Sequence, residues 1–236
     1  MAQKKLVRFA AIKTYPHVLE YPDNMPGKWR DFFGNDHPIT LELACGRGEY
    51  AVGLARLHPM QNFIGVDIKG NRIYVGARQV LNEGLRNAGF LRTHIDKIAT
   101  YFAKGEVQHI WITFPDPQLR TSRARKRLTH PRFLRLYQQI LSCDGFVHLK
   151  TDSPALFEFT KRVIEMYGLK LVEENDDIYK DPALSDELKI KTHYELLDIA
   201  GSNRTHYLRF ALPPEPLPDL DEHLQEFIKL NENAAS

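Results

Sequence analysis

The 236-residue sequence contains little cysteine and no long hydrophobic run. Its two cysteines, Cys45 and Cys143, are too few for a disulfide scaffold, and neither belongs to a metal-ligand spacing such as CxxC. The ten histidines form no HExxH pair, so we expect no metal centre. No apolar stretch approaches the length of about 20 residues that spans a membrane, and the basic N-terminal segment has no signal-peptide core. These absences predict a cytoplasmic protein without membrane attachment.

Positive charge is concentrated in one segment, although the formal net charge is only +2. Residues 119–135 contain no acidic side chain, and their basic side chains are Arg120, Arg123, Arg125, Lys126, Arg127, Arg132 and Arg135. Such a cluster is typical of a surface that binds a polyanion. The alternative interpretation is a solvated loop and helix face.

Short apolar segments rich in β-formers alternate with segments of helical periodicity. The predicted strands are 39–45, 62–68, 90–95, 109–114 and 145–151, and the predicted helices are 49–58, 70–89, 131–141 and 154–168. This alternation predicts an α/β fold with a Rossmann-like, doubly wound and mostly parallel sheet. Two further strands, 170–175 and 205–212, have no clear helix between them. We therefore expect an antiparallel hairpin at the edge of a seven-stranded sheet.

The chain length fits one large domain with flanking segments. We expect residues 1–38 to form an irregular, basic N-terminal arm and residues 39–212 to form the α/β domain. Residues 213–236 should form a C-terminal tail with one short helix.

The first predicted strand leads into ELACGRGEYA, residues 42–51. Gly46 and Gly48 allow a turn to pass close to a ligand, and the following helix directs its free N–H groups at that ligand. Gly46, Gly48 and Ala51 also satisfy a G-x-G-x-x-A pattern, so a nicotinamide-dependent oxidoreductase is one interpretation. Glu42 argues against it, because an acid on a core strand needs a partner and would repel a pyrophosphate. A cationic cofactor such as S-adenosylmethionine would be attracted by Glu42.

Three more acids follow predicted strands. Asp67 ends the second strand about 20 residues after the glycines, where an acid commonly accepts hydrogen bonds from ribose hydroxyls. Asp96 follows the third strand, and Asp116 follows the fourth. Ligands of open α/β sheets bind at the carboxyl ends of the strands, so these acids and Glu42 are candidate ligand contacts. The alternative for each acid alone is a helix N-cap or a solvated loop charge.

Asp116 lies between two prolines in FPDPQLR, immediately before the basic cluster. Proline on each side restricts the backbone and directs the carboxylate, so this acid is a candidate for function. Further along, the motif HLKTD ends the fifth predicted strand at Asp152. In the alternative interpretation, Thr151 or Asp152 caps the helix that follows.

Taken together, these motifs resemble those of the bacterial tRNA (guanine-N7)-methyltransferases. The matching elements run in order over roughly residues 38–212: ELACGRG, GVDIK, the aspartate after the third strand, FPDP with a basic run ending RKRL, HLKTD, and THYE at 192–195. The resemblance implies methyl transfer from S-adenosylmethionine to N7 of the guanosine at position 46, in the variable loop of tRNA. The implied cofactor contacts are Glu42, Gly46, Gly48, Asp67, Asp96 and Asp116, with Asp116 also at the catalytic centre. The implied substrate contacts are Arg120, Asp152, Thr192, Tyr194 and Glu195.

Guanine N7 carries an in-plane lone pair, so the chemistry needs no general base. The enzyme must instead align N7 with the methyl carbon and the sulfur, and it must tolerate positive charge that moves onto the purine. We hypothesise that Asp116 or Asp152 accepts hydrogen bonds from the guanine, with Glu195 assisting. The exposed bases of folded RNA suit such recognition.

The chain departs from the family pattern at several positions. Ala44 stands where the family usually has glycine, Gln118 where it usually has tryptophan, and Leu119 and Arg123 near usual histidines. A second hypothesis is therefore a tRNA-binding or RNA-binding protein on a methyltransferase fold, with weak or altered catalysis. The sequence leaves open whether the protein is a monomer or a homodimer.

Overall fold

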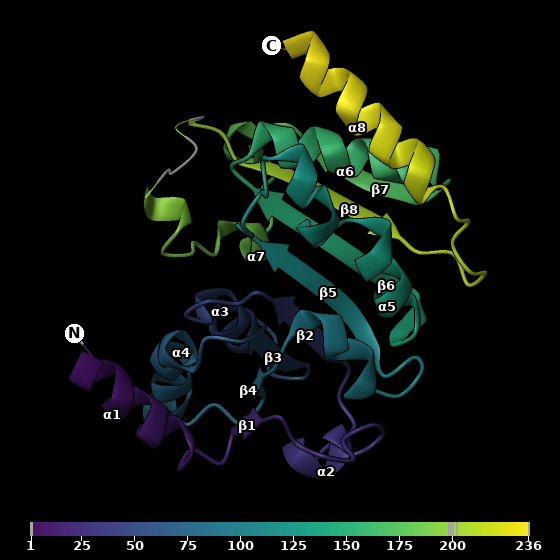
Figure 1. Ribbon diagram of the computed structural model, residues 1–236. Coiled ribbons are helices and arrows are strands. Elements are labelled where there is room, and N and C mark those ends of the chain that lie inside the picture. Colours follow the sequence, from purple (N-terminus) through teal and green to yellow (C-terminus); the bar gives the residue numbers. More distant parts are fainter. Residues whose placement is uncertain (1, 198–200, 202, 236) are drawn as a thin grey trace.

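The computed structural model describes residues 2–197, 201 and 203–235. Residues 1, 198–200, 202 and 236, which belong to the segments predicted above, lie outside the described residues. One mixed sheet has the strand order β1-β4-β3-β2-β5-β6-β8-β7 (Figure 1). The strands are β1 Val18–Glu20, β2 Ile39–Leu43, β3 Asn62–Asp67, β4 Ala88–Arg92, β5 Val107–Thr113, β6 Leu141–Thr151, β7 Lys170–Asn175 and β8 His206–Ala211. Pairings among β1 to β6 are parallel, whereas β8 is antiparallel to both β6 and β7. The predicted α/β fold class and its antiparallel edge are confirmed.

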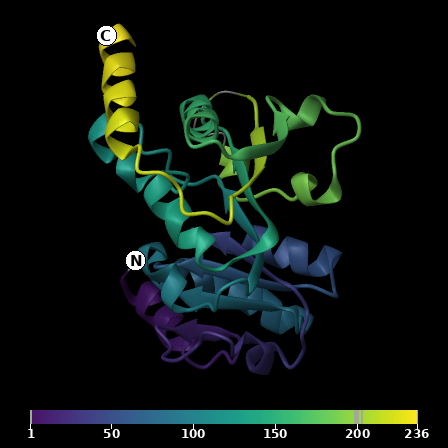
Figure 2. The ribbon, with the colours of Figure 1, turned by 90° about the vertical axis from the view of Figure 1, so that its right-hand side faces the viewer.

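Helices cover both faces of the sheet. One apolar cluster joins the sheet to α1 Ala2–Ile12, α3 Glu49–Leu57, α4 Gly70–Glu83 and α7 Asp186–Lys189. The other cluster joins it to α2 Trp29–Phe33, α5 Pro131–Gln138, α6 Pro154–Met166 and α8 Asp221–Ala235. The 3-10 helices are η1 Ile95–Thr100, η2 Thr121–Lys126, η3 Ile178–Lys180 and η4 Glu195–Leu197. The N-terminal elements and α8 lie at opposite ends of the molecule (Figure 2).

Residues 1–38 differ from the irregular arm that we expected. This region contributes α1, α2 and the short strand β1, which adds an eighth strand to the sheet by pairing with β4. Trp29 is fully buried, stacks on Phe102 and donates a hydrogen bond from Nε1 to the carbonyl of Tyr101 at 2.8 Å. The strand has only three residues, too few for an alternating pattern in the sequence to predict it.

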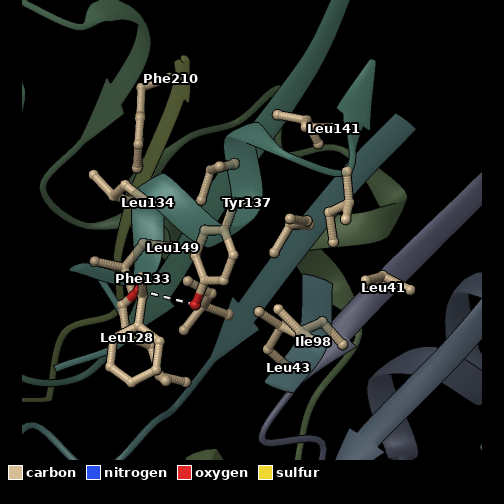
Figure 3. Packing of buried hydrophobic residues seen from close by; sticks show 14 of the residues in the cluster. Leu41, Leu43, Ile98, Leu128, Phe133, Leu134, Tyr137, Leu141, Leu149 and Phe210 are labelled. Atoms are coloured by element: carbon tan, nitrogen blue, oxygen red, sulfur yellow. Dashed lines mark hydrogen bonds between the residues drawn. The ribbon is translucent and has the colours of Figure 1, made fainter. Parts of the chain in front are cut away.

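The larger core lies between the sheet and α5 (Figure 3). Leu41 and Leu43 from β2 are fully buried, as are Leu134 and Tyr137 from α5. Tyr137 donates its hydroxyl proton to the carbonyl of Leu128 at 3.0 Å, so its polar atom is satisfied inside the core. Each such apolar side chain contributes about 1.5–3 kcal/mol through burial. This packing provides a rigid base for the loops at the carboxyl ends of the strands.

Candidate functional site

The turn from β2 to α3 has a backbone that can approach a ligand closely. Gly46 and Gly48 have φ values of 57° and 73°, in the left-handed region that favours glycine. A Cβ atom on Gly48 would lie 2.4 Å from Cε1 of Phe90, so no larger residue fits there. Ala44 also has a positive φ, of 56°, a conformation that glycine adopts with less strain than alanine.

Asp67 holds this turn from the end of β3. Its Oδ2 accepts a hydrogen bond from the Gly46 N–H at 2.9 Å, and its Oδ1 accepts one from the Lys69 N–H at 2.7 Å. The two glycines, Asp67 and Ala44 therefore belong to one structural unit. That unit forms part of the wall of a cavity.

The cavity has a volume of about 380 Å³ and lies beside the carboxyl ends of β2, β3 and β4. Its lining residues are Ala44, Asp67, Ile68, Thr93, His94, Ile95, Asp96, Lys126, Leu128, Arg132 and Phe133. Asp96 forms an ion pair with Arg132 and is not the N-cap of η1, which is His94. Carboxylates next to apolar walls fit a nucleoside, because ribose hydroxyls need acceptors and a purine needs an apolar slot.

Glu42 is buried beneath the same turn, with 2% of its surface exposed. Its Oε2 accepts the Ala51 N–H at 2.8 Å, and its Oε1 accepts the Thr113 hydroxyl at 2.8 Å. Burial raises the pKa of Glu42 to about 8 against the effect of these two hydrogen bonds. Glu42 thus ties the first turn of α3 to the end of β5. Its direct contact with a cofactor stays a prediction.

Asp116 lies in a constrained loop after β5, and its side chain is exposed. Its Oδ1 accepts the Gln118 N–H at 3.0 Å, which fixes the turn locally. Phe114 and Gln118 have φ values of 45° and 48°, and such left-handed conformations cluster at functional sites. The loop therefore presents one carboxylate to solvent from a strained backbone.

Arg127 holds this loop through hydrogen bonds to its backbone, a role that the sequence did not indicate. Its guanidinium donates to the carbonyls of Pro117, Gln118 and Leu119 at 3.2–3.4 Å. It also lies over the Phe159 ring, 4.4 Å from the centroid, and only 6% of its surface is exposed. Arg127 therefore acts as a clamp on the loop and is not available as an exposed RNA contact.

The other basic side chains of residues 119–135 divide into two groups. Arg132 pairs with Asp96, and Arg135 pairs with Asp221 at 2.8 Å. Arg120, Arg123, Arg125 and Lys126 are exposed on or beside η2, next to the Asp116 loop. Only part of the basic cluster is thus presented to a polyanion.

The THYE segment lies over the glycine turn. A Cβ atom on Gly46 would meet Cε2 of Tyr194 at 3.3 Å, so this tyrosine packs against the turn. Thr192 Oγ1 accepts the Glu195 N–H at 3.1 Å, and the Glu195 carboxylate accepts the Thr192 N–H at 3.3 Å. The same carboxylate forms a buried ion pair with Lys150 at 3.1 Å. The structure thus gives Glu195 protein partners, and its contact with guanosine stays a prediction.

Asp152 follows the end of β6, beside the strand that leads to Asp116. The alternative that Thr151 or Asp152 caps α6 is wrong, because the N-cap is Ser153, which accepts the Leu156 N–H at 3.3 Å. Thr151 Oγ1 instead accepts the Ser153 N–H at 3.1 Å. Ser153 is therefore the cap of α6, and Asp152 remains a candidate for substrate binding.

The described part of the chain contains neither a membrane-spanning helix nor a cluster of metal ligands. None of its helices is long and apolar enough to cross a membrane. Within the same described residues, no group of three or more His, Cys, Asp or Glu side chains is placed to hold a metal ion.

Comparison with known proteins gives a family match over most of the chain. The model of the family described as "Putative methyltransferase" matches residues 36–205. A tRNA (guanine-N(7)-)-methyltransferase of Bacteroides thetaiotaomicron is 46% identical, with 100% of this chain and 98% of the relative covered. One of Porphyromonas gingivalis with the same name is 47% identical, with 85% of this chain and 86% of the relative covered.

Solved structures share the fold at low sequence identity. The 16S rRNA methyltransferase KamB matches with a TM-score of 0.62 and 14% identity, covering 83% of this chain and 96% of that chain. A variant of a 16S rRNA (adenine(1408)-N(1))-methyltransferase from Catenulisporales acidiphilia, with cosubstrate SAM, matches with a TM-score of 0.58 and 12% identity. It covers 84% of this chain and 95% of that chain. The shared architecture supports the fold alone.

Proposed function

The chain belongs to the tRNA (guanine-N(7)-)-methyltransferase family, and we propose that it transfers a methyl group from S-adenosylmethionine to N7 of guanosine 46 in the variable loop of tRNA. The observation that carries the proposal is the similarity to the relative of Bacteroides thetaiotaomicron, which is 46% identical over the whole of this chain. The membership overturns the nicotinamide interpretation of Gly46, Gly48 and Ala51. Because its proposed substrate is tRNA, we also propose that the protein acts in the cytoplasm.

The cofactor would occupy the cavity of about 380 Å³ and the adjoining glycine turn. Asp67 and Asp96 would accept hydrogen bonds from the ribose and the adenine, while the backbone of the turn at Gly46 and Gly48 would lie against its polar end. When bound, S-adenosylmethionine supplies an electrophilic methyl group on a sulfonium. Buried Glu42 would support this region by fixing the start of α3.

The guanosine would be held on the other side of the turn. We assign to Asp116 the acceptance of hydrogen bonds from N1–H and the exocyclic amine, which orients the base and offsets the positive charge that develops on it. Asp152, Thr192 and Tyr194 would complete the guanosine side, with Glu195 assisting. The N7–carbon bond forms as the carbon–sulfur bond breaks, and no proton leaves N7. Alignment by these residues therefore provides most of the rate enhancement.

The exposed part of the basic cluster would hold the tRNA backbone. Arg120, Arg123 and Arg125 lie on the surface beside the Asp116 loop, where they can bind phosphates and leave the base free to enter the site. A weakly catalytic RNA-binding protein remains the second candidate. It is favoured by Gln118, where related sequences usually place tryptophan.

Two tRNA transcripts that differ only at position 46 test the proposal. With methyl-labelled S-adenosylmethionine, the transcript with guanosine 46 should acquire label, and the transcript with adenosine 46 should not. Equal binding of both transcripts without labelling of either would select the second candidate. Labelling of both would refute position 46 as the acceptor.

A further inference from the structure

Lys150 is a fully buried cation on a central strand. It lies near the end of β6, and its side chain has 0% exposure. A charge in this environment is costly unless it is paired and all its protons are bound. The partners of Lys150 therefore indicate why the fold retains it.

The ammonium of Lys150 uses its three protons on one segment of the chain. Nζ donates to the carbonyl of Leu188 at 2.9 Å, to the carbonyl of Ile190 at 2.8 Å and to Oε2 of Glu195 at 3.1 Å. The Tyr179 hydroxyl donates to the other oxygen of Glu195. Both ends of residues 188–195, which we call the covering segment, are thus attached to β6 through one side chain.

The covering segment spans the region from α3 to the glycine turn. Ile190 packs on Gly53 of α3, where an added Cβ would meet its Cγ2 at 2.8 Å. Tyr194 lies against Gly46, and the guanidinium of Arg72 lies 5.4 Å from the Tyr194 ring centroid. The segment carries Thr192 and Tyr194 to the place where cofactor and guanosine would meet.

The backbone of Lys150 contacts the opposite side of the site. Its carbonyl accepts the Phe114 N–H at 2.8 Å, at the start of the Asp116 loop. Its ammonium also lies 5.6 Å from the Phe114 ring centroid. One residue therefore links the Asp116 loop to the covering segment.

We propose that Lys150 is a positioning residue, whose ammonium fixes the covering segment over the glycine turn and thereby sets Thr192 and Tyr194 relative to Asp116. The inference rests on the proposed function, because it assigns these residues to the guanosine side. Lys150 itself touches neither cofactor nor substrate. Its effect is on alignment, where a displacement of about 1 Å can cost about 100-fold in rate.

The charge of Lys150 is set by groups on several elements. Burial lowers the pKa of Lys150 to about 8, Glu195 opposes that shift, and Lys191 adds to it. The rings of Tyr50 and Tyr179 also face the ammonium, and burial raises the pKa of both tyrosines, so both stay neutral while Lys150 titrates. Loss of the Lys150 proton removes one donor and the attraction to Glu195.

The test begins with Lys150→Met, which removes the ammonium and keeps an unbranched side chain. We expect kcat for tRNA methylation to fall about 100-fold, while KM for tRNA stays within about threefold because the exposed arginines are unchanged. Lys161→Met is the matched control, since Lys161 pairs with Glu174 on the surface at 2.7 Å. Its kcat should equal that of the wild type.

A second variant separates positioning from folding. Lys150→Met leaves Glu195 buried without its cation, so the double variant Lys150→Met/Glu195→Gln removes both charges. We expect the double variant to melt closer to the wild type and to remain slow. Recovery of kcat to the wild-type value in a well-folded double variant would overturn the proposal.

Hydrogen exchange gives a readout that needs neither tRNA nor cofactor. In Lys150→Met, amide protection should fall in residues 188–195 and stay unchanged in β2 and β3. Unchanged protection of residues 188–195 would overturn the proposal even if wild-type activity is absent. An inactive wild type with the expected loss of protection would instead refute the proposed function alone.

The pH profile provides the last readout. The alkaline decline of kcat should move to higher pH in Lys191→Met, which removes a neighbouring cation, and to lower pH in Glu195→Gln, which removes the carboxylate. A lysine with a purely structural role would leave this decline in place in both variants. That result would contradict the proposal.

Discussion

The division of the basic cluster into exposed and inward-facing arginines predicts how salt affects tRNA binding. Arg120, Arg123 and Arg125 are exposed, whereas Arg135 is engaged with Asp221. Each phosphate contact contributes about 0.9 to the slope of log affinity against log salt concentration. The triple variant of the exposed arginines to glutamine should therefore lower that slope by about 2.7. When salt rises from 50 to 200 mM, the factor by which tRNA affinity falls should be about 40 times smaller for the triple variant than for the wild type.

Fluorescence titration of labelled tRNA at several salt concentrations measures this slope. Arg135→Gln is the control, because it removes a positive charge from the same residues 119–135, but one that is paired with Asp221. It should lower the melting temperature by breaking the pair with Asp221, and it should leave the salt slope unchanged. The reasoning is refuted if the triple variant keeps the wild-type slope, or if Arg135→Gln alone lowers the slope by as much as the triple variant.

Three further predictions follow from buried groups and the backbone. The pKa of Glu42 is raised from 4.5 to about 8, so between these pH values the folded protein holds a proton that unfolding releases, and wild-type stability should decline by at most about 5 kcal/mol as pH rises from 4.5 to 8. Urea denaturation of Glu42→Gln should lack that decline, and an equal decline in both proteins would contradict the assignment. Arg127→Lys loses the planar guanidinium, whose Nε and Nη2 reach three carbonyls from two separate atoms, so kcat should fall more than tenfold with an unchanged salt slope, and a change in slope alone would show that Arg127 binds RNA instead. In Ala44→Gly, relief of the left-handed strain opposes the greater entropy of the unfolded chain, so stability measured by urea denaturation should change by less than about 1 kcal/mol, and a larger change would contradict this balance.

The sheet could be predicted from the sequence because its parallel strands are continuous apolar runs. All residues of β2 and β3 are buried, and so are the last four residues of β5. β1 could not be predicted, since its three residues carry no periodic pattern and are held by pairing with β4. Propensity is too weak to define so short a strand without its neighbour.

The sequence predicted that two acids lie together, but it did not predict the directions of the basic side chains. Asp67 and Asp96 do line one cavity, as their positions after successive strands indicate. The sequence could not show that Arg127 faces inward, because charge composition does not record side-chain direction. Lys150 was missed although a signal was present, since the argument that a charge on a core strand needs a partner applies to it as it does to Glu42.

The role of Asp116 is tested most directly by the turnover of Asp116→Ala, with nucleoside analysis of the labelled tRNA. Asp144→Ala is the control, because Asp144 is also exposed and lies in β6 away from the site. We expect label in 7-methylguanosine for the wild type and Asp144→Ala, and none for Asp116→Ala, although the latter should keep the wild-type melting temperature. Near-normal formation of 7-methylguanosine by Asp116→Ala would contradict the central role given to this carboxylate.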